Sequence, residues 1–154
     1  MGNHIFLTSA EFAVSRPAIY FIFSKVHRYL YIGQTYDKGG VLSRLRHHLC
    51  DEDNSSFLRR LEEDIGEPRD SLRDLYVACY FLKGKQFWSY ETSYREGVEF
   101  CVQKLVYERQ AGFSQCFKVI SFVRTNKTSD FAFVQNEALQ AVRVFQDVLE
   151  RIPK

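Results

Sequence analysis

Runs of apolar residues separated by short polar segments predict a small sheet. Two runs lie close together, and the mostly polar link 24–28 between them predicts a β-hairpin with strands at about 18–23 and 29–33. A third apolar run, rich in residues that favour strands, predicts another strand at 75–82. We therefore expect the sheet to be small and antiparallel.

Other segments have the periodicity of helices. Helices are predicted at about 57–65, 93–110 and 136–152, and Gly66 stands where the first of these would have its C-cap. One more helix is predicted directly after the glycine-ended loop 34–40. The residues that form its apolar stripe are Val41, Leu42, Leu45 and Leu49.

The C-terminal part of the chain predicts a second hairpin, because apolar runs at 117–123 and 131–134 flank the polar segment 125–130. The fold class expected is mixed α/β, in the sense of α+β. It combines a small antiparallel sheet flanked by helices with an added C-terminal β-hairpin and helix. The chain has 154 residues and no visible repeat or linker, so residues 1–154 are expected to form a single domain.

Composition is typical of a globular protein, with 45% hydrophobic and 26% charged residues. The N-terminus lacks a signal-peptide pattern, and no apolar run approaches membrane-spanning length. These features predict a cytoplasmic protein with no membrane partner. The four cysteines show no Cys-X-X-Cys spacing, which disfavours a zinc site or a disulfide framework and favours buried, reduced thiols.

The net charge of +2 gives little support to nucleic-acid binding by itself. Basic residues nevertheless gather in one part of the chain, ahead of acidic stretches at 51–53 and 62–64. This distribution predicts a positive surface beside a negative one, and a solvated surface of mixed charge is the alternative. The basic group comprises Lys25, His27, Arg28, Lys38, Arg44, Arg46, His47 and His48.

Two strings within the predicted hairpin carry the most specific signal, AIY at 18–20 and YIG at 31–33. Each places a tyrosine in an apolar strand, where alternation fixes the direction of its side chain. The pair resembles the signature of the GIY-YIG nucleases, with Ala18 in place of the first glycine. The resemblance covers about 17–114 as a GIY-YIG-like core, leaves 115–154 as an extension, and implies a metal-dependent phosphodiesterase.

The resemblance implies that Tyr20 and Tyr31 are catalytic. An isolated strand tyrosine is more often a half-buried core residue, but two such strings at this spacing favour function. The unperturbed pKa of a phenol is near 10, so each tyrosine would relay a proton or orient water only beside a metal-bound water or a cation.

The resemblance also implies an arginine in the following helix, and Arg44 fits that position behind a loop lengthened at 37–40. Arg44 and His48 are four residues apart and share a helix face at the border of the apolar stripe. A guanidinium suits phosphate, although an ordinary surface arginine is the alternative. His48 is chemically the better base near neutral pH, whereas the resemblance points to the tyrosines, and both remain open.

A carboxylate on a later helix is implied as the ligand of one divalent ion, Mg²⁺ or Mn²⁺. Glu99 lies at the border of an apolar arc on the helix 93–110, while Glu96 lies further towards water. The string GFS at 112–114 resembles the Gly-Tyr-Asn of family members, with Ser114 replacing the asparagine, and also indicates Glu99. We expect Glu99 to bind the metal, with Glu96 as the fallback and a surface glutamate as the alternative.

Contacts to nucleic acid are expected from polar residues around this site. Asn54 opens a polar segment that resembles one in homing-type members of the family, although helix capping explains it equally well. The expected nucleic-acid contacts are Lys25, Arg28, Lys38, Arg46, His47 and Asn54.

The function expected is a Mg²⁺-dependent endonuclease that hydrolyses DNA phosphodiester bonds. Specificity would come from a homodimer, a partner protein or the extension 115–154. The main alternative is an adaptor of the same fold that binds nucleic acid or protein without catalysis. The departures at Ala18, 37–40 and Ser114 favour that adaptor, and a structural protein that uses an aromatic surface has no motif in its favour.

Overall fold

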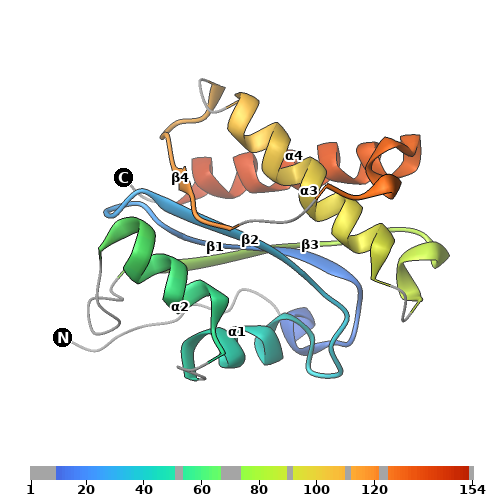
Figure 1. Ribbon diagram of the computed structural model, residues 1–154, viewed down its shortest axis with the longest axis horizontal. Coiled ribbons are helices and arrows are strands. Elements are labelled where there is room, and N and C mark those ends of the chain that lie inside the picture. Colours follow the sequence, from blue (N-terminus) through green and yellow to red (C-terminus); the bar gives the residue numbers. More distant parts are fainter. Residues whose placement is uncertain are drawn as a thin grey trace.

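The computed structural model describes residues 10–50, 54–66, 74–89, 92–109, 112–121 and 125–152. It is a mixed α/β fold, in which a four-stranded sheet lies between two layers of helices (Figure 1). The strands are β1 (Ala18–Ser24), β2 (Tyr29–Thr35), β3 (Leu75–Phe81) and β4 (Lys118–Val119). The α-helices are α1 (Gly40–Cys50), α2 (Ser56–Arg60), α3 (Ser93–Arg109) and α4 (Ala132–Arg151).

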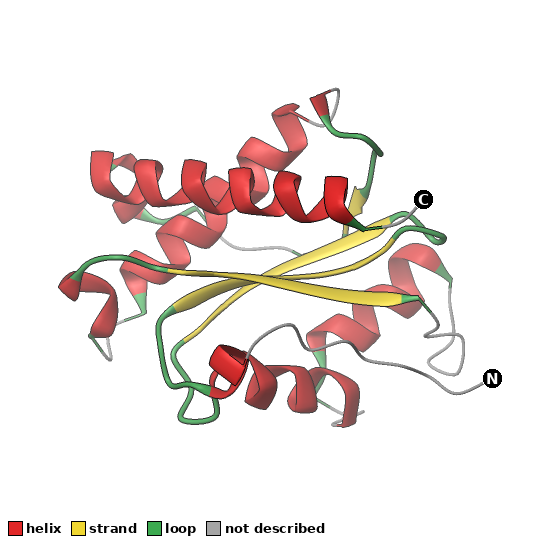
Figure 2. Ribbon diagram, turned by 180° about the vertical axis from the view of Figure 1, so that it is seen from behind, coloured by secondary structure: helices red, strands yellow, loops and turns green. Residues whose placement is uncertain are grey.

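The strand order is β3-β1-β2-β4, so β1 is central and pairs antiparallel with both β2 and β3. All seven residues of β1 are buried, which explains why its sequence is a continuous apolar run. Helices α1 and α2 cover one face of the sheet, and α3 and α4 cover the other (Figure 2).

Helix α4 belongs to the core. The ring of Phe145 stacks on Phe21 of β1 with a centroid distance of 4.6 Å and meets Phe23 edge-on at 5.3 Å. Its apolar stripe faces the sheet and α3 and consists of Val134, Ala138, Ala141, Val142, Phe145 and Leu149. The C-terminal part of the chain therefore supplies, through α4, half of the helical layer that it shares with α3.

The predicted C-terminal hairpin is wrong. Residues 131–134 lie at the start of α4, and β4 is a two-residue strand that pairs parallel with β2. Val134 is the first member of the buried stripe of α4, while Phe131 and Phe133 are partly exposed and stack on each other at 5.6 Å. A run of only four residues, all of them apolar, fits a strand and the end of a helix equally well. Residues 122–123 of the predicted strand lie outside the described residues.

The first hairpin, the third strand and the helices before residue 110 are confirmed, within a few residues of their predicted ends. The predicted helix 57–65 divides into α2 and a π-helical turn, with Ser55 as N-cap and Gly66 as a left-handed C-cap at φ 76°. Residue 110, the predicted end of the long helix, lies outside the described part of the chain.

The four cysteines are free, but the expectation of buried thiols is wrong for two of them. Cys101 is buried and Cys79 is partly buried, whereas Cys50 and Cys116 are exposed. Among the helices that the structure describes, none is both long enough and apolar enough to cross a membrane.

Candidate active site

The candidate site is centred on Tyr20, in the middle of β1. Its side chain is 1% exposed, and Gly33 of β2 is its direct partner in the antiparallel register. A Cβ atom on Gly33 would overlap the Tyr20 hydroxyl. The glycine of the YIG string therefore leaves the space in which the phenol of Tyr20 lies across the neighbouring strand.

His48 on α1 is the polar partner of Tyr20. The Tyr20 hydroxyl lies 2.8 Å from Nε2 of His48, and the tautomer of the ring decides which of the two atoms donates the hydrogen bond. Ser55 Oγ donates to the backbone carbonyl of His48 at 2.7 Å, which ties the end of α1 to the start of α2. Burial lowers the pKa of His48 to about 4, and the charge of Arg44 adds to this effect. The imidazole is therefore neutral at pH 7.

Tyr31 lies beside Tyr20 on the same face of the sheet. The two rings stack with their centroids 6.4 Å apart, and the Tyr31 hydroxyl lies 2.8 Å from the hydroxyl of Ser56. Phe57 packs edge-on against the Tyr31 ring at 5.5 Å. Burial raises the pKa of Tyr20 and of Tyr31. Both phenols are consequently protonated at neutral pH.

Arg44 lies one helical turn before His48 on α1 and is partly buried. Burial raises the pKa of Tyr20 and Tyr31, and the positive charge of Arg44 lowers both values. The guanidinium therefore lies close to both hydroxyl groups. The Nε atom of Arg44 is buried and has no hydrogen-bond partner among the described residues. Buried donors are normally satisfied, and an orphaned one in a cleft is suited to an incoming acceptor.

Glu99 reaches the same region from α3, on the opposite face of the sheet. Burial raises the pKa of Glu99 to about 8, the charge of Glu96 adds to the increase, and Arg44 opposes it. The charge of Glu99 also acts on both tyrosines. The structure therefore brings Glu99 together with the residues of β1, β2 and α1.

The carboxyl group of Glu99 is chemically suited to a hard cation. Gln103 Nε2 donates to it at 3.5 Å, and no described cationic side chain forms an ion pair with it. Glu96, the fallback ligand, accepts a hydrogen bond from Thr92 Oγ1 at 3.0 Å at the exposed start of α3. Within the described ranges no group of three or more His, Cys, Asp or Glu side chains gathers. An ion held by one carboxylate and waters needs no such group.

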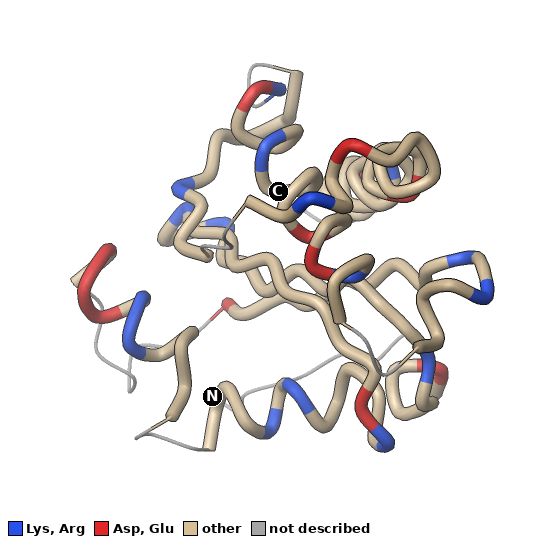
Figure 3. Tube along the Cα trace, turned by 45° about the vertical axis from the view of Figure 1, so that its right-hand side comes forward, with Lys and Arg blue, Asp and Glu red and all other residues tan. Residues whose placement is uncertain are grey.

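The expected nucleic-acid contacts do not form one positive surface. Lys25 and Arg28 lie in the turn between β1 and β2, each five residues from the Tyr20–Gly33 pair, or about 17 Å along the strand. Lys38 is exposed in the loop after β2, at the other end of that strand. Figure 3 shows Lys and Arg spread over several separate parts of the chain. This spread fits the alternative, a solvated surface of mixed charge, better than a single positive surface.

The other expected contacts lie nearer the site. Arg46 and His47 are exposed on α1, and Asn54 is exposed just before α2. Ser55 caps α2 by accepting a hydrogen bond from the backbone N–H of Leu58 at 3.1 Å. The acidic stretch 51–53 lies outside the described residues.

A cleft of about 230 Å³ adjoins Arg44, and the sequence analysis missed most of it. Arg95 on α3 is its main unpredicted residue. Arg95 lies four positions before Glu99, and this spacing would have placed it on the same helix face. The cleft is lined by Gln34, Thr35, Tyr36, Asp37, Arg44, Thr92 and Arg95.

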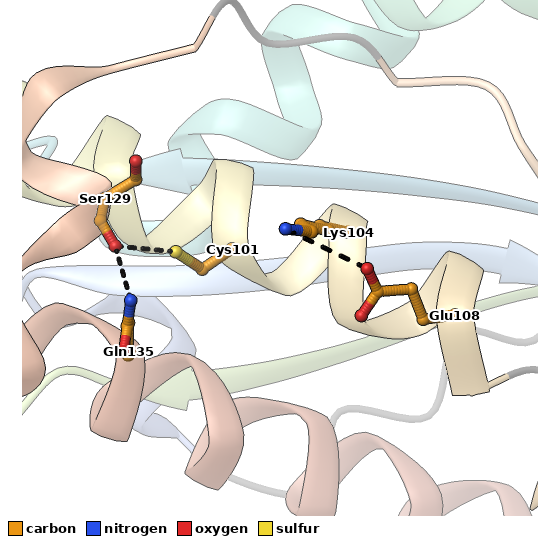
Figure 4. Close-up of polar contacts among 5 residues, drawn as sticks. All are labelled: Cys101, Lys104, Glu108, Ser129 and Gln135. Carbon is orange, nitrogen blue, oxygen red and sulfur yellow. Dashed lines mark hydrogen bonds and ion pairs between the residues drawn. The ribbon is translucent and has the colours of Figure 1, made fainter.

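A larger cavity of about 330 Å³ lies between α3 and α4, and Cys101, Lys104 and Glu108 contribute to its wall. Figure 4 shows the polar contacts of these three residues. At 100° per residue these side chains point away from Glu99 on the opposite side of α3. Several polar groups of this cavity bond to one another, through a Lys104–Glu108 ion pair of 3.9 Å and a contact of 3.5 Å from Cys101 Sγ to the Ser129 carbonyl. We therefore place no reaction there.

The string 112–114, which pointed to Glu99 in the sequence, follows α3. Phe113 packs on Phe145 with their ring centroids 6.0 Å apart, and Ser114 is exposed. This segment therefore joins the apolar core at one residue and faces solvent at the next.

A scan against models of protein families finds no match to this chain, and neither does a search of curated proteins or of solved structures. The resemblance to GIY-YIG nucleases therefore rests on the sequence strings, and the argument for function rests on the geometry around Tyr20.

Proposed function

We propose that this chain is a metal-dependent endonuclease that hydrolyses phosphodiester bonds of nucleic acid, with DNA as the first substrate to test. One observation carries the proposal. The Tyr20 hydroxyl is bonded to the neutral imidazole of His48, and its pKa is affected both by the guanidinium of Arg44 and by the carboxyl group of Glu99. Hydrolysis of a phosphodiester needs a route for the proton of water, a cation for the phosphate and a ligand for a divalent ion, and these residues supply all three.

Arg44 supplies the cationic group. Its buried, unpartnered Nε–H and the rest of its planar guanidinium suit the oxygens of a phosphate. Because charge accumulates on the phosphate as the reaction proceeds, a donor fixed in advance stabilises the transition state more than the ground state.

Tyr20 and His48 supply the proton route. The Tyr20 hydroxyl orients the attacking water and takes its proton while passing its own proton to Nε2 of His48. Burial raises the pKa of Tyr20 and lowers that of His48 to about 4. A phenolate is not stable at this buried position, so the two transfers are coupled, and the positive charge left on His48 is balanced by the negative charge that develops on the phosphate. Tyr31, fixed by Ser56, supports the Tyr20 ring.

Glu99, with Glu96 as the fallback, would hold one Mg²⁺ or Mn²⁺. When bound, such an ion polarises a phosphoryl oxygen and stabilises the leaving oxygen. Glu99 must lose its proton to act as a ligand, so affinity for the ion should increase as pH rises towards 8. With a single carboxylate, binding should be weak enough for a chelator to remove the ion.

Plasmid nicking, measured with and without Mg²⁺ or Mn²⁺, tests the proposal. We expect Arg44→Ala and Glu99→Gln each to lower the rate by about 100-fold or more while DNA binding is retained. Glu108→Gln on the opposite side of α3 and Arg143→Ala at an exposed position of α4 are the matched controls and should cut like wild type. Absence of cutting by wild type with either metal would overturn the nuclease, and binding without cutting would identify the adaptor.

A further inference from the structure

The cleft beside Arg44 extends the candidate site away from Tyr20 and His48, towards Arg95 on α3. The geometry points to a nucleotide subsite there, in which Arg95 together with Arg44 binds a phosphate and Trp88 stacks on the adjoining unpaired base. This inference rests on the proposed function. It narrows the substrate class to nucleic acid that presents an unpaired base next to the position of cleavage.

Arg95 is a buried cation that forms no ion pair within the described part of the chain, although the negative charge of the neighbouring Glu96 acts on it. Its side chain is 4% exposed, and no described carboxylate lies within ion-pair distance of it. Nε donates to Gln34 Oε1 at 3.1 Å, and Nη1 donates to the carbonyls of Phe87 at 2.8 Å and Ser89 at 2.5 Å. These bonds fix the plane of the guanidinium before any ligand arrives.

The fixed guanidinium retains unused donors. Its hydrogen bonds engage Nε and Nη1, and Nη2 has no partner among the described residues. The guanidinium is buried, so its charge is held away from water at a cost in free energy. An anion in the cleft would offset that cost, because a buried charge is stable only when it is paired.

The other residues of the cleft also suit a phosphate. Arg44 contributes a second guanidinium and Thr35 a hydroxyl group, whereas the Thr92 hydroxyl already donates to Glu96. Asp37 is the one carboxylate among the described lining residues, so two positive charges face one negative charge. The balance remains favourable to an anion, and Arg44 links this cleft to the residues around Tyr20.

An aromatic surface adjoins the cationic cleft. The guanidinium carbon of Arg95 lies 5.5 Å from the centroid of the Tyr36 ring, and that ring meets Trp88 edge-on at 5.6 Å. Trp88 is 42% exposed, at the end of a 3₁₀ turn, Lys85–Trp88. Arg95 bonds to the carbonyls on either side of Trp88, so the phosphate donor and the indole are held by one set of contacts.

An exposed indole beside a fixed arginine is the arrangement on which single-stranded nucleic acid stacks its bases. A base within a duplex cannot offer its face to a side chain unless it leaves the stack. The cleft therefore favours unpaired nucleotides, such as those in single strands, flaps or open junctions. Stacking reads the flat face that all bases share, so we expect little dependence on sequence.

The chain contains a single tryptophan, so intrinsic fluorescence reports on Trp88 directly. We would titrate the protein in EDTA with a thymidine trinucleotide, thymidine monophosphate or inorganic phosphate. The trinucleotide should quench Trp88, and phosphate should compete with it without quenching. Equal affinity for the monophosphate would instead assign the cleft to a free nucleotide, and no quenching by either would overturn the subsite.

Variants test the two halves of the subsite by the anisotropy of a labelled single-stranded decamer. Trp88→Leu should weaken binding by roughly tenfold, as expected for the loss of one stacked base. Arg95→Gln should reduce the slope of log affinity against log salt by about 0.7, the value for one phosphate contact on a single strand. Arg95→Lys retains the charge and should preserve the slope, which keeps the test valid if Arg95→Gln fails to fold.

Matched controls are Tyr107→Leu, which removes an aromatic ring that is 76% exposed on α3, and Arg143→Gln on α4. Both should bind like wild type, and equal binding by all variants would overturn the subsite. The measurements are made without metal, so they do not depend on cutting. Quenching by a protein that never nicks DNA would support the subsite and contradict the proposed nuclease activity. Nicking without quenching would support the nuclease activity and contradict the subsite.

Discussion

The two faces of β1 differ in chemistry although they are equally buried. Tyr20 is 1% exposed and Phe21 is 0% exposed, yet they are neighbours in sequence and point to opposite layers. Phe21 packs on Phe145 of α4 in an apolar layer. Tyr20 packs in a second, largely apolar cluster that includes Tyr31, but its hydroxyl group bonds to His48 of α1. The apolar face gains stability from burial and close packing, whereas the other face buries polar groups that must be satisfied at a cost.

The two faces also differ in how completely their polar groups are satisfied. Glu137 of α4 is buried on the apolar side, where its carboxylate accepts hydrogen bonds from the Tyr80 hydroxyl at 3.1 Å and the Lys83 N–H at 2.9 Å. On the other side, the buried Nε of Arg44 has no partner in the described part of the chain. A buried polar group that is already satisfied stabilises the fold, and an unsatisfied one is available to a ligand.

The largest effects are expected from substitutions at the neighbouring positions Tyr20 and Phe21. One should change mainly the nicking rate, and the other mainly the free energy of unfolding. We expect Tyr20→Phe to lower the nicking rate by about 10²–10⁴-fold, because it removes the proton relay. The free energy of unfolding should change by only about 1 kcal/mol, for the loss of one hydrogen bond. Phe21→Ala should instead lower it by about 3–5 kcal/mol.

Urea unfolding and nicking rates per folded molecule measure both variants. Phe21→Ala should retain the rate of wild type once it is folded. A comparable loss of activity in the two variants would contradict the assignment of catalysis to the Tyr20 face and of stability to the Phe21 face.

Acid should destabilise the polar face through His48. The folded protein binds this proton at about pH 4, and the unfolded chain binds it near pH 6.5. The unfolded state therefore carries more protons between these values, so stability decreases as pH falls from 6.5 to 4, by at most about 3 kcal/mol. Urea unfolding of wild type and His48→Gln at pH 7 and pH 4 should show a smaller decrease for the variant.

The buried residues of the apolar face provide the control for this titration. Phe145→Leu removes no titrating group and should lose the same stability between the two pH values as wild type. Equal decreases in wild type and His48→Gln would mean that His48 is not held neutral by the fold.

Gly33→Ala should displace Tyr20 without removing its hydroxyl. The added methyl group overlaps the Tyr20 hydroxyl, and crowding of this kind typically costs about 1–3 kcal/mol. Nicking should fall because the phenol moves away from His48. Gly112→Ala adds the same group where no heavy atom lies within 4 Å and should change neither stability nor rate. Wild-type activity in Gly33→Ala would show that the position of Tyr20 is not required.

Local sequence signals predicted most of the elements correctly. The hairpin of β1 and β2, the start of α1 and the C-cap at Gly66 depend on residues close together in the chain, and all are confirmed. The spacing of Arg44 and His48 likewise predicted a shared face of α1. The strand predicted at 131–134 failed because four apolar residues contain too little periodicity to distinguish a strand from a helix end.

The sequence by itself determined the hairpin with its two tyrosines and the helical placement of the basic and acidic candidates. Only the tertiary structure decided that α1 and α3 approach Tyr20 from opposite layers, that β4 pairs in parallel, and that Arg95 is fixed beside Trp88. The physical reason is that periodicity records the preferences of neighbouring residues. The pKa of a group and the set of residues that line a cleft depend instead on residues that are distant along the chain.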